Sequence, residues 1–138
     1  MVRKTNTVYQ STRHAKFSLS YHFIWCPKYR KGILSRPEIV QAVKDSIHEM
    51  AKTYGCTVNA LEVMPDHVHL SLSAPPRYSP AHLAGKFKGA SGSRIAAHFP
   101  EVKQRGKVWT NSYFCASLGS VSTELIRRYI ESQWRCIE

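Results

Sequence analysis

Residues 67–73, with the sequence HVHLSLS, alternate strictly between two kinds of side chain. Val68 and two leucines occupy one set of alternate positions, and His67, His69 and two serines occupy the other. Because successive side chains of a β-strand point to opposite faces, this alternation predicts a strand with one buried and one polar face. It is typical of an antiparallel sheet that is covered on one side only. Both histidines are therefore expected on the face that the main core does not use.

Three further segments predict strands of the same sheet, because apolar and polar residues alternate along them and turn residues bound them. They are residues 16–26, which end before Pro27, residues 57–64, which a turn at Pro65 and Asp66 joins to residues 67–73, and residues 108–117, which are interrupted at Asn111 and Ser112.

Three segments have apolar residues at helical spacing. In the first, Ser35 is expected to cap the helix with Glu38 completing a capping box, and Gly55 is expected to end it. The other two are expected at residues 80–98, after Ser79, and at residues 122–134. The order strand, helix, strand, strand, helix, strand, helix predicts an α+β, ferredoxin-like (RRM-like) antiparallel sheet. Helices cover one face, and a C-terminal helix is added. The other face is left for a partner, as in RNA-recognition modules.

The length of 138 residues suits a single domain, which we place at residues 16–138. Residues 1–15 are expected to form a basic N-terminal arm, loose over its first dozen residues. We find neither a secretory signal nor a stretch apolar enough to span a membrane. The four cysteines include no C-x-x-C pair, which favours reduced thiols over a zinc or redox motif. These features predict a cytoplasmic protein.

Basic residues are in excess, and the excess is regional. The 20 Lys and Arg against 9 Asp and Glu give a formal net charge of +11. Residues 1–37 hold eight basic residues and no acidic one, whereas residues 38–66 sum to −3. A basic face on a small domain favours a polyanionic partner, most often nucleic acid, because neutralised phosphates release counterions. The alternative is that these side chains are solvated and serve only solubility.

Two small groups of residues are candidates for chemistry. His67 and His69, one pleat apart, could hold a divalent cation, since neutral imidazole is a common metal ligand; such a pair is also typical of plain polar surface. Tyr129 and Gln133 stand four residues apart, so they share one helical face and could approach one site together. The alternative is that Tyr129 packs partly in the core while Gln133 is solvated.

Several distinct motifs occur in one order along the chain. They are YHFIWCPKYRK at residues 21–31, MPDHVHLSLS at 64–73, KGASGSRI at 88–95, VWTNSYFCAS at 108–117 and YIESQ at 129–133. Together they resemble the single-tyrosine HUH transposases of small bacterial and archaeal insertion sequences, over about residues 16–134. The His-hydrophobic-His motif, the tyrosine and the glutamine four positions later all match the family's pattern.

The resemblance implies an enzyme that cuts and rejoins single-stranded DNA and recognises hairpins near the element ends. Tyr129 is implied to be the nucleophile, which forms a 5′-phosphotyrosine intermediate. His67, His69 and Gln133 are implied to bind a divalent metal, Mg²⁺ or Mn²⁺, although two imidazoles would also suit zinc or cobalt. A free tyrosine has a pKa of about 10, so its deprotonation must be assisted, and no dedicated base is identified.

The resemblance also implies a homodimer whose sheets join, with the tyrosine helix of one subunit completing the metal site of the other. The basic residues near the motifs are candidate phosphate contacts, and Tyr29 or Trp109 could stack an unpaired base. For each of these residues, solvated surface is the alternative. The DNA-binding candidates are Lys28, Tyr29, Arg30, Lys31, Lys86, Lys88 and Arg94. We expect the protein to be associated with the nucleoid when it is bound to DNA.

Other functions are compatible with parts of this pattern. A non-catalytic, RRM-like nucleic-acid-binding module would use the open sheet face without needing the histidines. A nucleotide hydrolase of the H-x-H-x-H kind is disfavoured, because Ser71 occupies the third alternate position. A domesticated enzyme that acts on chromosomal repeats is a variant of the main hypothesis. The sequence does not set the resting position of the helix that carries Tyr129.

Overall fold

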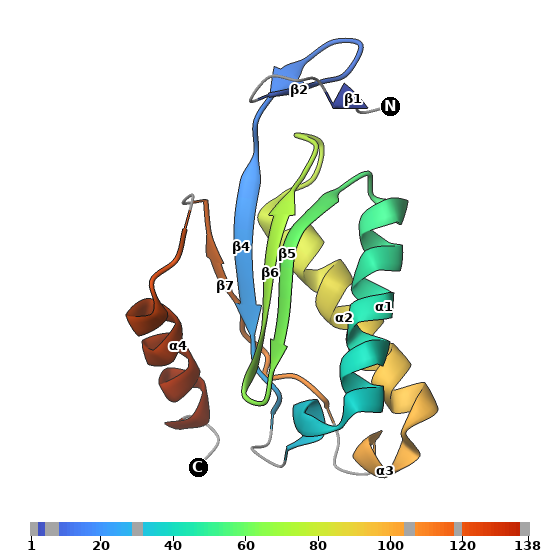
Figure 1. The fold of residues 1–138 in the computed structure, drawn as a ribbon, viewed down its shortest axis with the longest axis vertical. Helices are drawn as coiled ribbons and strands as arrows, with labels where there is room; N and C mark the ends of the chain where they lie inside the picture. The colour runs from blue at the N-terminus through green and yellow to red at the C-terminus, as the bar shows by residue number, and fades with distance from the viewer. Residues whose placement is uncertain (1–2, 5–8, 29–31, 104–106, 118–119, 136–138) are drawn as a thin grey trace.

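The structure is a computed structural model that describes residues 3–4, 9–28, 32–103, 107–117 and 120–135. A four-stranded antiparallel sheet lies at its centre (Figure 1). In spatial order its strands are β5 (Thr57–Met64), β6 (His67–Ser73), β4 (Ser20–Trp25) and β7 (Phe114–Ala116). β5 and β6 have the bounds predicted from alternation and from the turn between them.

The helices follow the strands in the predicted order. α1 (Pro37–Thr53) connects β4 to β5, α2 (Pro80–His98) connects β6 to β7, and α4 (Thr123–Arg135) follows β7. α1 and α2 pack together on one side of the sheet (Figure 1). This chain order and the strand order β5-β6-β4-β7 confirm the ferredoxin-like α+β fold.

The main core lies between the sheet and these two helices. Val68, Leu70 and Leu72 of β6 are fully buried there, together with Phe23 and Trp25 of the neighbouring β4. Fully burying such a side chain stabilises the fold by about 1.5–3 kcal/mol. A slip of one residue would turn this whole set to the other face, so the packing fixes the register. It thereby fixes His67 and His69 on the opposite face.

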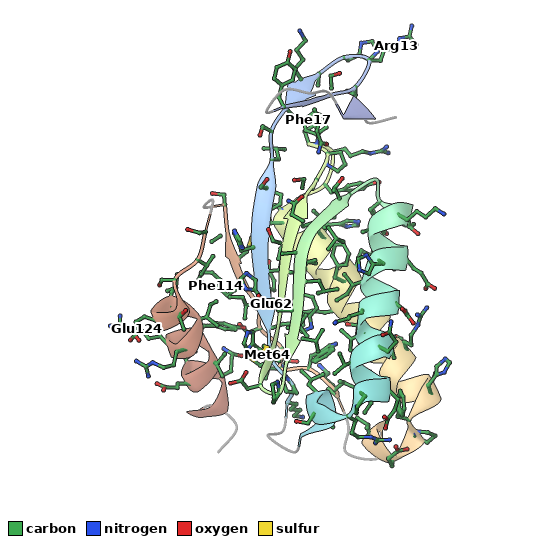
Figure 2. All side chains as sticks on the ribbon, in the orientation of Figure 1. Arg13, Phe17, Glu62, Met64, Phe114 and Glu124 are labelled. Atoms are coloured by element: carbon green, nitrogen blue, oxygen red, sulfur yellow. The ribbon has the colours of Figure 1, made fainter. Side chains whose placement is uncertain are left out.

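α4 covers part of that opposite face. Ile126 and Ile130 of α4 line a cleft together with His67. Ile130 is 5% exposed and Ile24 of β4 is 0% exposed, although neither belongs to the main core cluster. Figure 2 shows Phe114 between β7 and α4. The face expected to be open for a partner is therefore partly occupied by the chain's own last helix.

The start of α1 differs from the prediction. Arg36 is the N-cap residue, and no side chain caps the helix. Ser35 instead ends a short 3-10 turn, η1 (Ile33–Ser35), in which its N–H donates to the Gly32 carbonyl at 3.0 Å. Because Ser35 already belongs to this turn, the predicted capping box with Glu38 does not form. The side chain of Glu38 accepts a hydrogen bond from Arg36.

Two other helix boundaries are confirmed. Gly55 follows α1 with a φ of 67°, and the N–H of Cys56 reaches back to the Ala51 carbonyl at 2.8 Å. This left-handed position is the one that glycine adopts without strain. At the start of α2, the Ser79 hydroxyl accepts the N–H of His82 at 3.1 Å.

The strand predicted over residues 108–117 is shorter in the structure. Only Phe114–Ala116 pairs with β4, while Trp109 forms an isolated bridge with Pro27. The indole N–H of Trp109 donates to the Lys88 carbonyl of α2 at 3.0 Å. A Cβ at Gly92 would lie 3.1 Å from the Trp109 Nε1, so the glycine permits this close approach. The segment thus contacts α2 and the residues directly after β4 without forming a regular strand.

Two further features were not predicted. A short helix, α3 (Pro100–Lys103), follows α2. Near the N-terminus, β1 (Arg3–Lys4), β2 (Gln10–Ser11) and β3 (Lys16–Phe17) form a small antiparallel sheet. The expectation of a loose first dozen residues is therefore wrong for the described part of that segment, because its backbone groups pair there. The strand expected over residues 16–26 is divided between β3 and β4, and the domain boundary at residue 16 stays a prediction.

Candidate active site

His67 lies where the β5–β6 turn meets α4. Its Nδ1 is 2.6 Å from the Asp66 Oδ1, so a carboxylate in the turn orients the ring. Because Asp66 occupies Nδ1, the Nε2 atom is the nitrogen left to face a ligand. A cleft of about 290 Å³ adjoins this imidazole. Its lining consists of Asp66, His67, Thr123, Ile126, Arg127, Ile130 and Glu131.

His69 is paired with a histidine that the sequence analysis did not single out. The His22 Nδ1 lies 3.0 Å from the His69 Nε2, and His22 is only 9% exposed. Burial lowers the pKa of His69, and the neighbouring His22 adds to this effect. The neutral imidazole that metals prefer is thus favoured at His69. Alternation along β4 and its pairing with β6 could have indicated His22, since both rings lie on the same face.

Tyr129 projects from α4 toward β7 and the segment before it. Its hydroxyl donates to the Ser112 Oγ at 3.3 Å, and its ring centroid lies 5.8 Å from that of Phe114. Burial raises the pKa of Tyr129 to about 12, and the hydrogen bond with Ser112 acts in the opposite direction. The phenol is therefore protonated near neutral pH. Tyr129 is also half-buried against Phe114, which agrees with the alternative prediction that this side chain packs partly within the protein.

The phenol and His67 lie at the same end of the sheet. Trp25 pairs with Val68, so the next residues, Cys26 and His67, occupy adjacent positions of the neighbouring strands. Ionised Cys26 would raise the pKa of Tyr129, so this buried thiol is close enough to interact with the phenol. The thiol itself stays neutral, because burial raises its pKa to about 12. Cys26 directly follows β4, which lies between the histidine strand β6 and β7.

The expected ligand set is assembled only in part. Gln133 is half-buried on α4, one turn after Tyr129. Among the described residues, no hydrogen bond joins Tyr129 or Gln133 to His67 or His69, and neither lines the cleft. Within the same part of the chain, no group of three His, Cys, Asp or Glu side chains could hold a metal ion. The structure brings α4 to His67 but leaves the glutamine and the histidines unjoined.

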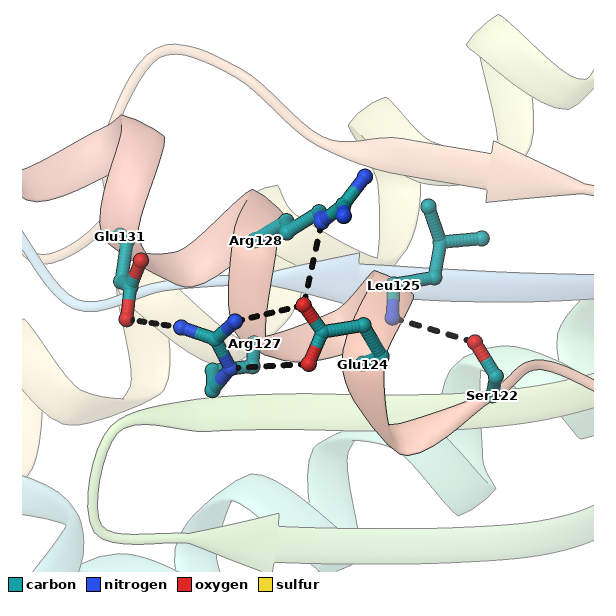
Figure 3. A network of polar contacts seen from close by, with 6 residues as sticks. All are labelled: Ser122, Glu124, Leu125, Arg127, Arg128 and Glu131. Atoms are coloured by element: carbon teal, nitrogen blue, oxygen red, sulfur yellow. Dashed lines mark hydrogen bonds and ion pairs between the residues drawn. The ribbon is translucent and has the colours of Figure 1, made fainter.

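Charged residues on α4 pair along the helix (Figure 3). Glu124 accepts hydrogen bonds from Arg127 and Arg128, and Arg127 also reaches Glu131 at 2.6 Å. The Ser122 hydroxyl caps the helix by accepting the N–H of Leu125 at 3.1 Å. Arg127 and Glu131 line the His67 cleft, so the charges that α4 brings there are already matched.

The predicted DNA contacts have different surroundings. Lys86 is exposed, while Arg94 forms an ion pair with Glu49 of α1. Lys88 is half-buried and donates to two backbone carbonyls. The backbone N–H of Lys28 donates to the Val108 carbonyl at 2.8 Å. Tyr29, Arg30 and Lys31 lie outside the described residues, and DNA contact stays a prediction for all seven candidates.

Trp109 is only 6% exposed and packs edge-on against Trp25, with ring centroids 6.2 Å apart. This packing does not favour the expected stacking on a base. None of the helices that the structure describes is long and apolar enough to cross a membrane.

Known proteins share both the sequence and the fold. The ISDra2 transposase TnpA of Deinococcus radiodurans is 38% identical over 120 residues, which cover 85% of this chain and 85% of that protein. The transposase for insertion sequence element IS200 of Salmonella typhimurium is 26% identical over 127 residues, covering 90% and 82%.

Two solved structures superpose on this one. A crystal structure of a candidate transposase from Deinococcus radiodurans R1 has a TM-score of 0.81 and 36% identity, covering 89% of this chain and 96% of that one. A REP-associated tyrosine transposase bound to a REP hairpin has a TM-score of 0.57 and 14% identity, covering 88% and 69%, which shows the shared fold. The family model described as "Transposase IS200 like" matches residues 15–133. With that match and a relative at 38% identity, the chain belongs to the IS200-like transposase family.

Proposed function

We propose that this transposase cleaves and rejoins single-stranded DNA at insertion-sequence ends, with Tyr129 as its nucleophile. One observation carries the proposal: the Tyr129 hydroxyl, bonded to Ser112, lies at the end of the sheet where Cys26 adjoins His67. A phenol and an oriented imidazole thus lie toward the same end of the sheet. In a member of the IS200-like family, this arrangement supports attack on a phosphate that reaches the same end of the sheet.

The proposed step exchanges one phosphodiester for another. The phenolic oxygen of Tyr129 attacks the scissile phosphorus in line with the 3′ oxygen and loses its proton. The bond between phosphorus and the 3′ oxygen breaks, and that oxygen takes up a proton to become a free 3′ hydroxyl. The 5′ phosphate stays on Tyr129 as an ester, so rejoining by a 3′ hydroxyl needs no ATP. Because burial raises the pKa of Tyr129 to about 12, the phenolate needs stabilisation when it forms.

We propose His67, His69 and Gln133 as the ligands of a divalent cation, Mg²⁺ or Mn²⁺. The chemistry of the donors fits, because Asp66 holds the Nδ1 of His67 and leaves its Nε2 as a donor, while His69 is kept neutral. Gln133 offers an amide oxygen on the helix that carries the nucleophile. A bound cation would supply positive charge that stabilises the negative charge growing on the phosphate.

The substrate we propose is a DNA hairpin that adjoins a single-stranded cleavage site. The net charge of +11 supports a polyanionic partner, and a protein with the same fold has been solved bound to a REP hairpin. The protein would then act in the cytoplasm, and it would be associated with the nucleoid when DNA is bound.

We propose that the active unit is a homodimer with shared sites. β5 and β7 are the edges of the central sheet, and unpaired edges can pair with a second chain. In the described chain, Gln133 and the histidines are not joined by hydrogen bonds. A partner's α4 would complete the metal site by supplying the missing ligand.

The decisive experiment is a search for a covalent adduct. Wild-type protein and Tyr129→Phe are incubated with Mn²⁺ and labelled single-stranded element ends, and the products are separated under denaturing conditions. We expect adducts from the wild type and none from Tyr129→Phe, with hairpin binding unchanged. Tyr54→Phe is the matched control, because Tyr54 packs against Tyr78 and His82, next to α2. Adducts from Tyr129→Phe would remove Tyr129 from its role. Hairpin binding without adducts in the wild type would identify a non-catalytic binding module.

Metal binding is tested separately and without DNA. Titration of Mn²⁺, followed by electron paramagnetic resonance, compares the wild type with His67→Ala and Gln133→Ala. We expect the affinity to fall by at least about tenfold in each variant. His48→Ala is the control, because His48 is exposed on α1. Equal affinities in all four proteins would refute the proposed ligand set.

A further inference from the structure

A lysine of α2 forms hydrogen bonds to the backbone just before β7. The Lys88 Nζ donates to the Thr110 carbonyl at 2.8 Å and to the Ser112 carbonyl at 2.9 Å. Lys88 is half-buried, so its ammonium has exchanged water for these two carbonyl oxygens. Hydrogen bonds to a charged group are among the stronger ones in proteins. The Lys88 side chain therefore holds the backbone of residues 110–112 in place.

The same segment is tied to its surroundings at other points. The N–H of Thr110 donates to the Cys26 carbonyl at 2.9 Å, and the Trp109 indole donates to the Lys88 carbonyl at 3.0 Å. The Val108 carbonyl accepts a backbone N–H at 2.8 Å. Although residues 108–112 form no strand, their backbone is bound both to α2 and to the residues that directly follow β4. Such a segment can hold a side chain in one place.

The side chain that it holds toward α4 is Ser112. Its Oγ accepts the Tyr129 hydroxyl at 3.3 Å, while the carbonyl of the same residue is bound by Lys88. Phe114, two residues later, packs against the ring of Tyr129. Ser112 is thus the hydrogen-bond partner of the phenolic oxygen, and Lys88 binds the backbone of that serine.

We propose that Ser112, anchored by Lys88, is a positioning residue that holds the phenolic oxygen of Tyr129 for its attack on the phosphate. The inference rests on the proposed role of Tyr129 and adds two residues to it. It gives Ser112 of the motif VWTNSYFCAS a role, and it gives Lys88 one that differs from the predicted phosphate contact.

The chemistry of a hydroxyl suits this role. A serine hydroxyl accepts a hydrogen bond from the neutral phenol and, after rotation, donates one to the phenolate. Ser112 can therefore keep its partner through the loss of the proton. This agrees with its effect on the pKa of Tyr129, which it lowers against the larger, opposite effect of burial. Among the described residues, the titratable group that acts on the phenol is Cys26, whose ionisation would raise that pKa.

The first test compares Ser112→Ala, Ser112→Thr and Asn111→Ala in single-turnover adduct formation with Mn²⁺ and saturating hairpin DNA. Loss of one hydrogen bond is expected to slow adduct formation roughly three- to tenfold in Ser112→Ala. Ser112→Thr keeps the hydroxyl and should recover most of the rate. Asn111→Ala is the matched control, because the Asn111 side chain accepts from Lys107 instead. The dissociation constant for the hairpin should stay the same in all three variants.

The second readout needs neither metal nor DNA. The seven tyrosines are replaced by 3-fluorotyrosine, and the ¹⁹F resonance of Tyr129 is assigned by its absence in Tyr129→Phe. In Ser112→Ala this resonance should shift and titrate at higher pH, whereas Ser112→Thr and Asn111→Ala should titrate like the wild type. An unchanged resonance together with an unchanged adduct rate in Ser112→Ala would overturn the proposal.

Lys88 is tested through its coupling to Ser112. Lys88→Met should slow adduct formation. If the two residues act together, the double variant Lys88→Met/Ser112→Ala should be slowed, relative to the wild type, by less than the product of the two single effects. Lys52→Met, an exposed lysine in the last turn of α1, controls for loss of charge. Multiplicative effects, or weaker hairpin binding at an unchanged rate, would overturn the role of Lys88. Persistent adducts in Tyr129→Phe would refute the proposed function itself, so the two failures are distinguishable.

Discussion

Gly92 of α2 offers a direct test of how firmly the segment before β7 is held. In Gly92→Ala the new Cβ would lie 3.1 Å from Nε1 and 3.3 Å from Cδ1 of Trp109. The indole cannot move away freely, because Trp109 is 6% exposed, packs edge-on against Trp25 and donates to the Lys88 carbonyl. Overpacking of this kind costs about 1–3 kcal/mol. Alanine regains about 1 kcal/mol of helix propensity, so we expect a net destabilisation of about 0–2 kcal/mol.

Gly85→Ala is the matched control on the same helix. A Cβ at Gly85 has no neighbour within 4 Å, so only the gain in helix propensity applies. That variant should be more stable than the wild type by about 0.5–1 kcal/mol. Urea denaturation measures both free energies of unfolding, and the two variants should differ by about 1–3 kcal/mol. Equal stabilisation by both substitutions would show that Trp109 yields easily, and the claim of a fixed segment would then fail.

Three further predictions concern α4. Ile130→Ala should destabilise the protein by about 2–5 kcal/mol, because Ile130 is 5% exposed, and hydrogen exchange should show faster opening of α4 than of α1; equal exchange in wild type and variant would contradict the docking. Stability should fall as pH rises from about 10 toward 12, because burial raises the pKa of Tyr129 to about 12, so the neutral phenol favours the fold below this window and ionisation opposes it above. Tyr129→Phe should lessen that loss in urea titrations at pH 8 and pH 11, and an identical loss would contradict the shift. Arg128→Ala should leave the denaturation midpoint unchanged, because its ion pair with Glu124 is solvent-exposed, whereas a clear drop would show a coupled network.

The sequence determined the elements whose pattern depends on near neighbours. Alternation over residues 57–64 and 67–73 predicted β5 and β6 to the residue, because the period of a strand is visible in the chain itself. The same alternation assigned His67 and His69 to the face opposite the main core. The motif that holds Tyr129 and Gln133 indicated the family to which the chain belongs. The predicted helix cap at Ser35 was wrong, because that residue belongs to the 3-10 turn that precedes α1.

Only the tertiary structure decided which distant groups meet. His22 and His69 are 47 residues apart, Lys88 and Ser112 are 24 apart, and no local period links either pair. The placement of α4 over the histidine face follows from burial of Ile130 and from the contact between Tyr129 and Phe114. The segment before β7 reads as a strand in sequence, yet the carbonyls of Thr110 and Ser112 are bound by a lysine of α2. Periodicity reports which side chains are apolar, whereas the choice among hydrogen-bond partners depends on groups that only the folded chain brings within reach.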